Sequence, residues 1–434
     1  MSQADWDRLQ YYSRKINVFF VADNSYDDSL IHPSTYLRIA QLQSSALFPS
    51  LRDLHYELDD SSKSHIFLFQ SPLLDSISLH EIEGFENTVV GPFLATLSSP
   101  TLRRITLSSG RMSVNTFKTS IYHFKQLRSL ELLDAVFMDD FGLWEVLGTL
   151  PSLTKLNLDI NPSYHPAHDP ENSNGHSGDS NHFDALEILF ITGSFFLIQH
   201  LLGFIDSPYL KSLALYPVID LAYVHEHENE HVDLLTPSMT IVVSKWSQSL
   251  KKLDISTSIR MHWQNRVVHR NSKLLTLLSG LHEIQSFNLL DWKMENYNDA
   301  VKRLATSWPK LRHLGKDSFN DTFISLSVLR IIAENCSDLR RLEIQLDTST
   351  IPPFDDIFSK SVHHNLEVLI VMGPGDPEDH QPDVITETMQ ESQIQMARHL
   401  DLIFPYLKTI EVQDKKWSWI SKLVKLCQDV RRGQ

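Results

Sequence analysis

The stretch SPLLDSISL, residues 71–79, contains the unit from which this chain is built. Six further copies keep the proline: FPSLRDLHY from Phe48, SPTLRRITL from Ser99, LPSLTKLNL from Leu150, SPYLKSLAL from Ser207, WPKLRHL from Trp308 and FPYLKTIEV from Phe404. Six copies lack it: QLRSLEL from Gln126, ALEILFI from Ala185, SLKKLDI from Ser249, EIQSFNL from Glu283, DLRRLEI from Asp338 and NLEVLIV from Asn365. Most successive copies lie about 26 residues apart, so the chain consists of tandem repeats.

The pattern L-x-x-L-x-L predicts a short strand in each copy. Its last two apolar positions are two residues apart, so both side chains fall on one face of a strand. One unit cannot bury that face alone, but stacked units can, because each strand pairs with the next and the leucines form continuous columns. The sequence therefore predicts an α/β leucine-rich-repeat solenoid, a curved horseshoe with parallel concave strands and convex helices.

Several segments between the columns have helical spacing. In LIQHLLGFI the apolar positions 197, 198, 201, 202 and 205 form one stripe of a helix. We expect further helices at GLWEVLGTL (142–150), NSKLLTLLSGL (271–281), DAVKRLATSW (299–308) and LSVLRIIAEN (326–335). The recurrent proline follows the helices and marks the passage into the next strand, because proline cannot continue a helix and favours an extended residue before it.

The repeats predict one solenoid over residues 1–414, with surface insertions near 161–182, 217–240 and 373–398. These insertions are polar and contain proline, glycine or acidic residues, as surface loops do. At the N-terminal end, Ile16, Phe19 and Val21 have the same three-column spacing, which predicts a degenerate first strand.

Residues 415–434 are predicted to form an amphipathic helix. Ile420, Leu423, Val424 and Cys427 fall on one stripe, with lysine and arginine opposite. A basic amphipathic helix can bind a membrane or calmodulin. A terminal helix of this kind more commonly caps the last repeat, and we expect that role here.

Composition narrows the functional classes. The formal net charge of −15 disfavours nucleic-acid binding and favours basic, peptide-like or neutral protein partners. Only two cysteines occur, Cys336 and Cys427, which argues for a reducing compartment. The polar N-terminus lacks the apolar core of a signal peptide, and no apolar run is long enough to span a membrane. We therefore expect a cytoplasmic or nuclear protein without a membrane partner.

Sequence motifs for catalysis or cofactor binding are missing. His225, His227 and His231 alternate with glutamates and could ligate a metal, but no second cluster completes a tetrahedral site. A solvated acidic loop is the expectation there, with no bound metal. GPGDP from Gly373 lacks the G-K-[ST] ending of a phosphate-binding loop, and no G-x-S-x-G occurs. We expect no cofactor and no enzymatic activity.

Strand alternation places some side chains on the face opposite the leucine columns. Most are polar, but Phe190, Tyr216, Ile370 and Met372 are not. Exposed apolar residues in such a row are candidate contacts for a partner protein. The alternative is that a long insertion covers them.

The phrases ADWDRLQYYSRKINVF, ALFPSLRDLHYEL and HIFLFQSPLLDSISL, together with the P-x-L repeats, resemble the repeat portion of the fungal F-box/leucine-rich-repeat family. The resemblance covers essentially the whole chain. It implies a substrate-recognition array of a ubiquitin ligase receptor, in which an N-terminal F-box docks on a Skp adaptor and a cullin. No F-box precedes Trp6, so those two partners are expected only if an upstream F-box exists. The alternative is a free-standing leucine-rich-repeat scaffold without a ubiquitin-ligase link.

Overall fold

The computed structural model describes most of the chain. The described residues are 3–21, 46–58, 63–82, 87–97, 101–108, 120–135, 142–160, 183–218, 235–256, 268–269, 272–290, 293–294, 296–315, 323–347, 350–352, 364–372, 387–412 and 415–433. The chain groups into two compact units. The N-terminal unit comprises Met1–Gly193 and Gly203–Leu210, and the C-terminal unit comprises Ser194–Leu202 and Lys211–Gln434.

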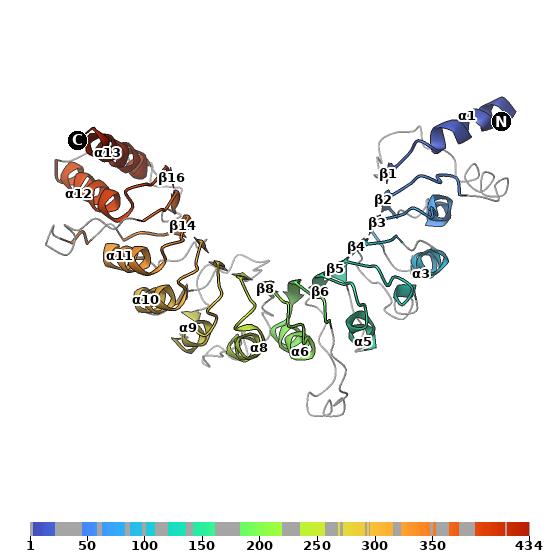
Figure 1. Ribbon diagram of the computed structural model, residues 1–434, viewed down its shortest axis with the longest axis horizontal. Helices are drawn as coiled ribbons and strands as arrows, with labels where there is room; N and C mark the ends of the chain where they lie inside the picture. The colour runs from blue at the N-terminus through green and yellow to red at the C-terminus, as the bar shows by residue number, and fades with distance from the viewer. Residues whose placement is uncertain are drawn as a thin grey trace. The chain divides into compact units, whose positions relative to one another are not determined.

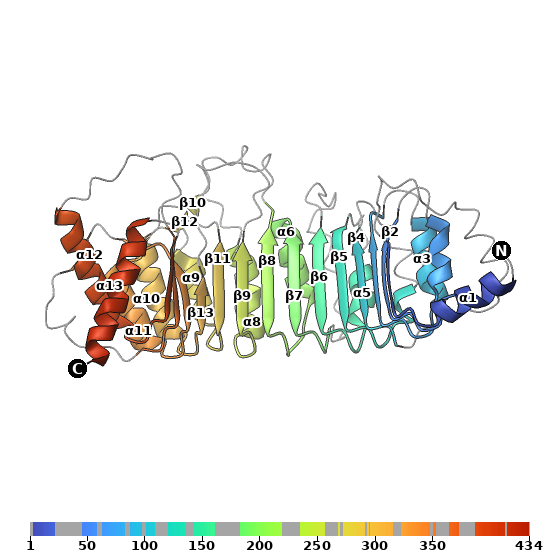
Figure 2. The same cartoon turned by 90° about the horizontal axis from the view of Figure 1, so that it is seen from above.

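Fourteen parallel strands form one open sheet in chain order, with helices between them (Figure 2). Two further short strands, β10 (Val268–His269) and β12 (Lys293–Met294), pair separately. The fourteen strands correspond to the thirteen copies of the repeat and the degenerate first strand predicted before them. The α/β fold with parallel repeat strands is thus confirmed.

The N-terminal unit contains seven of these strands. They are β1 (Val18–Val21), β2 (Asp53–Glu57), β3 (Ser76–His80), β4 (Arg104–Ser108), β5 (Ser129–Ala135), β6 (Lys155–Ile160) and β7 (Ile188–Gly193). Its described helical elements are α1 (Gln3–Ser13), the 3₁₀ segment η1 (Lys63–Phe69), α3 (Asn87–Thr96) and α5 (Gly142–Gly148). Helix α1 was not expected from the polar sequence of this segment.

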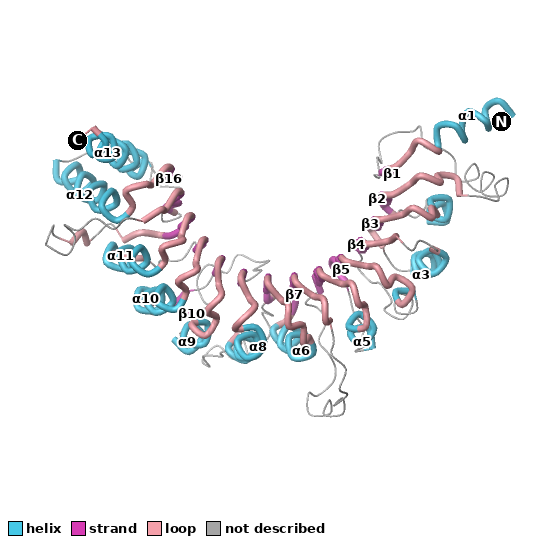
Figure 3. The backbone as a smooth tube through the Cα atoms, in the orientation of Figure 1, coloured by secondary structure: helices cyan, strands magenta, loops and turns pink. Residues whose placement is uncertain are grey.

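The other seven strands belong to the C-terminal unit. They are β8 (Ser212–Pro217), β9 (Lys252–Ser256), β11 (Ser286–Leu290), β13 (His313–Gly315), β14 (Arg341–Ile344), β15 (Val368–Val371) and β16 (Thr409–Val412). The helices after β8 are α8 (Thr236–Trp246), α9 (Ser272–Leu278), α10 (Tyr297–Ser307), α11 (Leu326–Asn335), α12 (Glu387–Ile403) and α13 (Lys415–Arg432). Helices α8 to α11 follow one another along one side of these strands (Figures 1 and 3). Helix α6 (Phe195–Phe204) is divided between the two units.

A hydrogen-bonded turn explains the recurrent proline. The backbone N–H of the first-column leucine donates to the carbonyl of the residue before the proline, as in Leu51 to Phe48, Leu311 to Trp308 and Leu407 to Phe404, each 3.1 Å. The proline therefore occupies the second position of the turn, where its fixed φ is favourable. The turn positions the first leucine of each copy in the same column.

The leucine columns form the core. All thirteen first-column residues are at most 4% exposed. In the second column, Leu342 of β14 lies in register between Leu314 of β13 and Leu369 of β15, and each is buried. Burying one such side chain contributes about 1.5–3 kcal/mol, so the columns provide a large part of the stabilisation.

The five segments with helical spacing are confirmed as α5, α6, α9, α10 and α11. Their apolar stripes are buried against the sheet and the neighbouring helices. In α11, for example, Leu326, Leu329, Ile332 and Ala333 are buried at helical spacing. Within the described ranges, none of the helices combines the length and apolar content needed to cross a membrane.

The boundaries of two predicted insertions need correction. Residues 217–240 include the end of β8 at Pro217 and the start of α8 at Thr236. Residues 373–398 include α12 from Glu387, whose Met396, Ala397 and Leu400 are buried. The acidic, proline-containing start of that segment obscured this helical stripe in the sequence. The insertion at 161–182 lies outside the described residues.

The predicted C-terminal helix is present as α13. Trp417, Ile420 and Val424 are buried, and α13 packs against α12 and β16. Leu423 and Cys427, which the sequence placed on the same stripe, are only half-buried. The helix is therefore rotated relative to the expected orientation.

Candidate interaction surface

We call the side of the strands opposite the leucine columns the outward face. It consists of the side chains that alternate with the buried columns along each strand. Phe190, Tyr216, Ile370 and Met372 are each half-buried and lie at such alternate positions. None of the four belongs to a buried column, as the sequence predicted, and their role in binding remains a prediction.

Ile370 and Met372 are brought together on β15 and the residue that follows it. They are two residues apart, so their side chains share one face. Val368, at the start of the same strand, is half-buried at the next alternate position. The outward face of β15 is therefore apolar along its length. The sequence VLIVM, 368–372, contains this signal, but only the last two of the three residues were selected from it.

Charged residues surround this apolar row. Ile370 lies in register between Glu343 of β14 and Glu411 of β16. The carboxylate Oε1 of Glu343 is 2.6 Å from Nε of Arg341 and 3.4 Å from Nε2 of His313. Such partly exposed ion pairs contribute little to stability. Their chemical effect is to place an apolar contact between polar groups, an arrangement found at protein interfaces.

Tyr216 lies apart from Ile370 and Met372. Its strand, β8, is five strands from β15 in the sheet order, which corresponds to about 24 Å at the usual strand spacing. Burial raises the pKa of the Tyr216 phenol, and the negative charge of Asp254 raises it further, so the phenol stays neutral. Asp254 is itself 9% exposed, and one of its oxygens lies 3.4 Å from Nζ of Lys252.

Phe190 lies on β7 in the N-terminal unit, in register with Asn157 of β6. The ammonium of Lys155 is 5.8 Å from the centre of the Phe190 ring, within the range of a cation–π contact. The same ammonium lies 2.5 Å from Oε1 of Glu131. Phe190 is thus part of a mixed aromatic and charged surface.

Two exposed residues of β1 were missed by the sequence reasoning. Val18 is 58% exposed and Phe20 is 68% exposed, and both alternate with Phe19 of the predicted first strand. The ring of Phe20 lies 5.9 Å from that of His55 on β2. The signal was available, because the spacing that identified Phe19 as a column residue also places Phe20 on the outward face.

The charge of the described surface differs from that of the whole chain. The described residues contain 31 lysines and arginines and 26 aspartates and glutamates, whereas the whole chain contains 39 and 54. In the C-terminal unit, exposed cations lie at or just before the starts of the strands, at Lys211, Lys251, Lys252, Arg312, Arg340, Arg341 and Lys408. The net charge of −15 of the whole chain therefore does not predict the charge of a partner that binds at the starts of these strands.

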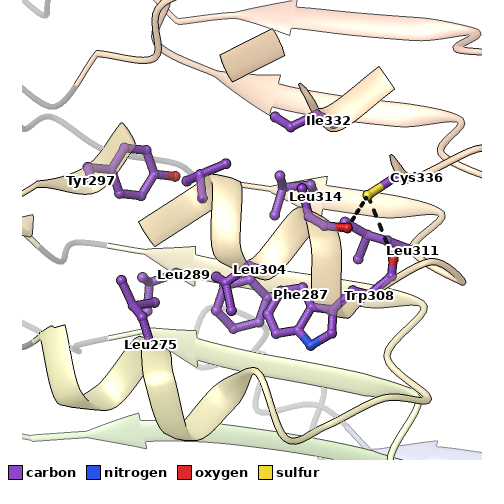
Figure 4. A pocket seen from close by; sticks show the side chains of 12 residues that line it. Leu275, Phe287, Leu289, Tyr297, Leu304, Trp308, Leu311, Leu314, Ile332 and Cys336 are labelled. Carbon is purple, nitrogen blue, oxygen red and sulfur yellow. Dashed lines mark hydrogen bonds between the residues drawn. The ribbon is translucent and has the colours of Figure 1, made fainter. Parts of the chain in front are cut away.

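An apolar gap lies between the sheet and helices α9 to α11 (Figure 4). Its lining is Leu275, Phe287, Leu289, Tyr297, Val301, Leu304, Ala305, Trp308, Leu311, Leu314, Ile332 and Cys336. The gap accommodates about one water molecule, so it is a packing feature of the core and not a pocket for an organic ligand.

The Cys336 thiol lies at this gap and donates towards the carbonyls of Ala305 and Trp308, at 3.5 and 3.7 Å (Figure 4). Burial raises the pKa of this thiol to about 12, so it is not a reactive thiolate at neutral pH. Among the described residues no group of three or more histidine, cysteine, aspartate or glutamate side chains could hold a metal ion. His225, His227 and His231 lie outside the described residues.

Searches against family models and curated proteins found no match. Solved structures with similar folds include yeast Rad7 in complex with Elc1, at 14% identity over 95% of this chain and 92% of the other, with a TM-score of 0.40. Another is the leucine-rich-repeat-containing protein LegL7 from Legionella pneumophila, at 9% identity over 95% and 97%, with a TM-score of 0.39. A protein from Bacteroides fragilis matches at 14% identity over 56% and 67%, with a TM-score of 0.33. Similarities this low do not establish a shared function.

Proposed function

We propose that this chain binds a partner protein through the outward face of its strands, with Ile370 and Met372 as the central apolar contact. The observation that carries the proposal is the apolar row on β15, half-buried and bordered by Glu343 and Glu411. Side chains at these positions take no part in the leucine columns, so their apolar character is not needed for the core. Phe190 of β7 and Tyr216 of β8 are further contact candidates.

Site-specific crosslinking followed by titration tests this binding face. A photoreactive amino acid replaces Met372 in the full chain, and a control carries it at Thr306, an exposed residue of α10. We expect position 372 to crosslink one protein that position 306 does not. That protein, once purified, should bind the unmodified chain, and Ile370→Glu should weaken binding at least tenfold because it places a charge in the apolar contact.

Thr306→Glu is the matched control for the titration and should leave the affinity unchanged. Both variants should remain folded by circular dichroism. Thr306→Glu should melt with the unmodified chain, whereas Ile370→Glu should melt somewhat earlier because it places a third carboxylate beside Glu343 and Glu411. An affinity that is the same for Ile370→Glu and the unmodified chain would exclude the outward face of β15 as the binding site.

We further propose that the bound protein is the substrate of an F-box-type ubiquitin ligase receptor, in the cytoplasm or the nucleus. This proposal rests on the resemblance of the repeat phrases to the fungal F-box family. Residues 1–434 alone should not bind a purified Skp adaptor, whereas the same residues fused behind an F-box should bind it.

A reconstituted ligase containing that fusion should ubiquitinate the crosslinked partner, and Ile370→Glu should suppress the modification. Strong adaptor binding by residues 1–434 alone would contradict the assignment of these residues to substrate recognition only. A partner that binds but is never ubiquitinated by the fusion would favour the alternative function, a free-standing interaction scaffold.

A further inference from the structure

The last helix, α13, is held in one orientation by specific contacts on its inner side. Nε2 of Gln428 donates to the carbonyl of Leu407, at 3.0 Å. Nη2 of Arg431 donates to the carbonyl of Pro405 at 2.7 Å and lies 2.9 Å from a carboxylate oxygen of Asp401 on α12. Together with the buried Trp417 and Ile420, these contacts determine which side of α13 faces outwards.

The outer side of α13 carries an apolar stripe. Trp419 is 54% exposed, Leu426 is 58% exposed and Val430 is 57% exposed. They are spaced by seven and four residues, which places them on one side of the helix, beside the half-buried Leu423. We call Trp419, Leu426 and Val430 the α13 stripe.

This stripe is unusual within the C-terminal unit. From Lys211 onwards, the other exposed large apolar side chains among the described residues are Ile394 of α12 and Tyr406, in the segment between α12 and β16. Single exposed apolar residues are common on protein surfaces, but a row of three on one helix is a feature of a helix–helix contact. Apolar exposure is therefore concentrated at the end of the helix layer.

The position of α13 in the stack explains the stripe. Helix α9 packs against both α8 and α10, and α10 packs against both α9 and α11. Helix α13 packs against α12 and the strand β16, and its outer side is the exposed one. The stripe has the form of a surface that would be buried if one more helix followed α13.

Charge decides which kind of helix fits. Lys422 is exposed one turn from both Trp419 and Leu426; Lys425 and Arg432 are exposed farther round the same flank, where Arg432 lies 3.9 Å from Asp429, the acidic residue among them. The ammonium of Lys422 lies 5.3 Å from the centre of the Trp419 ring. A second copy of α13 would bring like charges together, whereas acidic side chains beside an apolar row would pair with these cations.

We propose that the α13 stripe binds an amphipathic helix of a partner protein, one with an apolar row flanked by glutamate or aspartate. Trp419 and Val430 are eleven residues apart, so the stripe spans about 17 Å, or three helical turns. A partner helix of that length is marginally stable alone, and it belongs to a folded domain or folds on binding. This surface is separate from the outward face of β15, so its test is independent of the proposed function.

Two synthetic peptides and the full chain test the proposal. Both peptides have 21 residues with leucine at heptad positions a and d; one carries glutamate at e and g and the other lysine. Like charges at e and g keep each peptide monomeric. In fluorescence anisotropy, we expect the acidic peptide to bind at least tenfold more tightly than the basic one, and to bind less tightly as salt is raised.

Variants of the full chain locate the binding site. The double variant Trp419→Ala, Leu426→Ser should weaken binding of the acidic peptide at least tenfold, and Lys422→Glu, Lys425→Glu should weaken it without removing apolar surface. Tyr209→Ala removes an aromatic side chain of similar exposure, 60%, from the N-terminal unit and is the matched control. Thermal melts should be the same for all variants, because each replaced side chain is exposed.

Each alternative occupant gives a different result. Failure of the acidic peptide to bind, or equal binding by the double variant, overturns the proposal. Binding to vesicles of 70% phosphatidylcholine and 30% phosphatidylserine that the double variant loses, without peptide binding, would identify the stripe as a lipid-binding surface instead. A dimer seen by light scattering, and lost in the double variant, would show that a second copy of the chain occupies it.

Discussion

The interior repeats and the last repeat of the C-terminal unit have the same sequence pattern, but their second-column side chains are buried to different extents. Leu342 and Leu369 have column neighbours on both sides and are fully buried. Ile410 of β16 has the same column position, pairs in register only with Leu369, and is half-buried. The comparison shows that the burial of an apolar side chain in this fold depends on its neighbours in the stack and not on the repeat motif alone.

The largest effect is expected from a charge in the interior. Leu342→Asp places an unpaired carboxylate in a dry column, and it should lower the free energy of unfolding by about 3–5 kcal/mol. Thr409→Asp on the exposed side of β16 is the control and should change it by less than about 0.5 kcal/mol. Urea unfolding of both variants measures the difference. Equal losses of unfolding free energy in the two variants would show that burial in the column does not determine the effect of the introduced charge.

Removal of residues 415–434 should have the next largest effect. It deletes the buried Trp417, Ile420 and Val424 and uncovers the side of α12 that they contact. We expect a lower melting temperature, with a loss of about 2–4 kcal/mol, and aggregation detected by light scattering. An unchanged melt would mean that α13 is an interaction segment that does not cap the array.

Cavity-forming substitutions compare the two regions directly. Leu369→Ala should cost about 2–4 kcal/mol because the surrounding column cannot collapse. Ile410→Ala should cost about 1 kcal/mol, because solvent already reaches its side chain. Chemical denaturation of the two single variants measures both values. A larger loss for Ile410→Ala would reverse the comparison.

A smaller, pH-dependent effect is expected at His364. Its Nε2–H donates to the carbonyl of Cys336 at 2.7 Å, and its Nδ1 accepts from the N–H of Leu366 at 3.0 Å, so the ring is neutral. Burial lowers the pKa of this imidazole. Since the unfolded chain binds the proton more readily, stability is full above pH about 6.5 and falls as the pH drops below it.

The variant His364→Asn tests this assignment by removing the titrating group. We expect the decrease in unfolding free energy between pH 7 and pH 5.5 to be smaller than in the unmodified chain. It should not vanish, because burial also lowers the pKa of His200. An unchanged pH dependence would show that His364 does not contribute to it.

The sequence predicted the parts of the fold that repeat. Leu51, Leu213 and Leu407 could be placed in columns because the P-x-L spacing recurs and strand periodicity is strict. Helix α12 was missed because the acidic, proline-containing residues before it obscured its apolar stripe in the sequence. For α13, the periodicity of Ile420 and Val424 predicted a helix, but it could not show which of two adjacent apolar stripes packs against the protein.

The candidate interaction surface was predicted only in part. Ile370 and Met372 are half-buried at alternate positions, as alternation along a strand predicts, and their role in binding stays a prediction. Ile370 and Met372 share one side of β15 with Val368, whereas Tyr216 lies on β8, five strands away in the sheet. This grouping requires the order of the strands in the sheet as well as the alternation along each strand. The net charge of the whole chain did not indicate the cations at the strand starts, because it is dominated by acidic residues outside the described ranges.

Hydrogen–deuterium exchange of the full chain tests the central claim, that position in the stack sets the protection of each repeat. Within the C-terminal unit, the amides of strands that are paired on both sides, such as β13 and β14, should exchange slowly. Those of β16, the last strand of the sheet, should exchange fastest. Exchange in β16 as slow as in β14 would contradict the account.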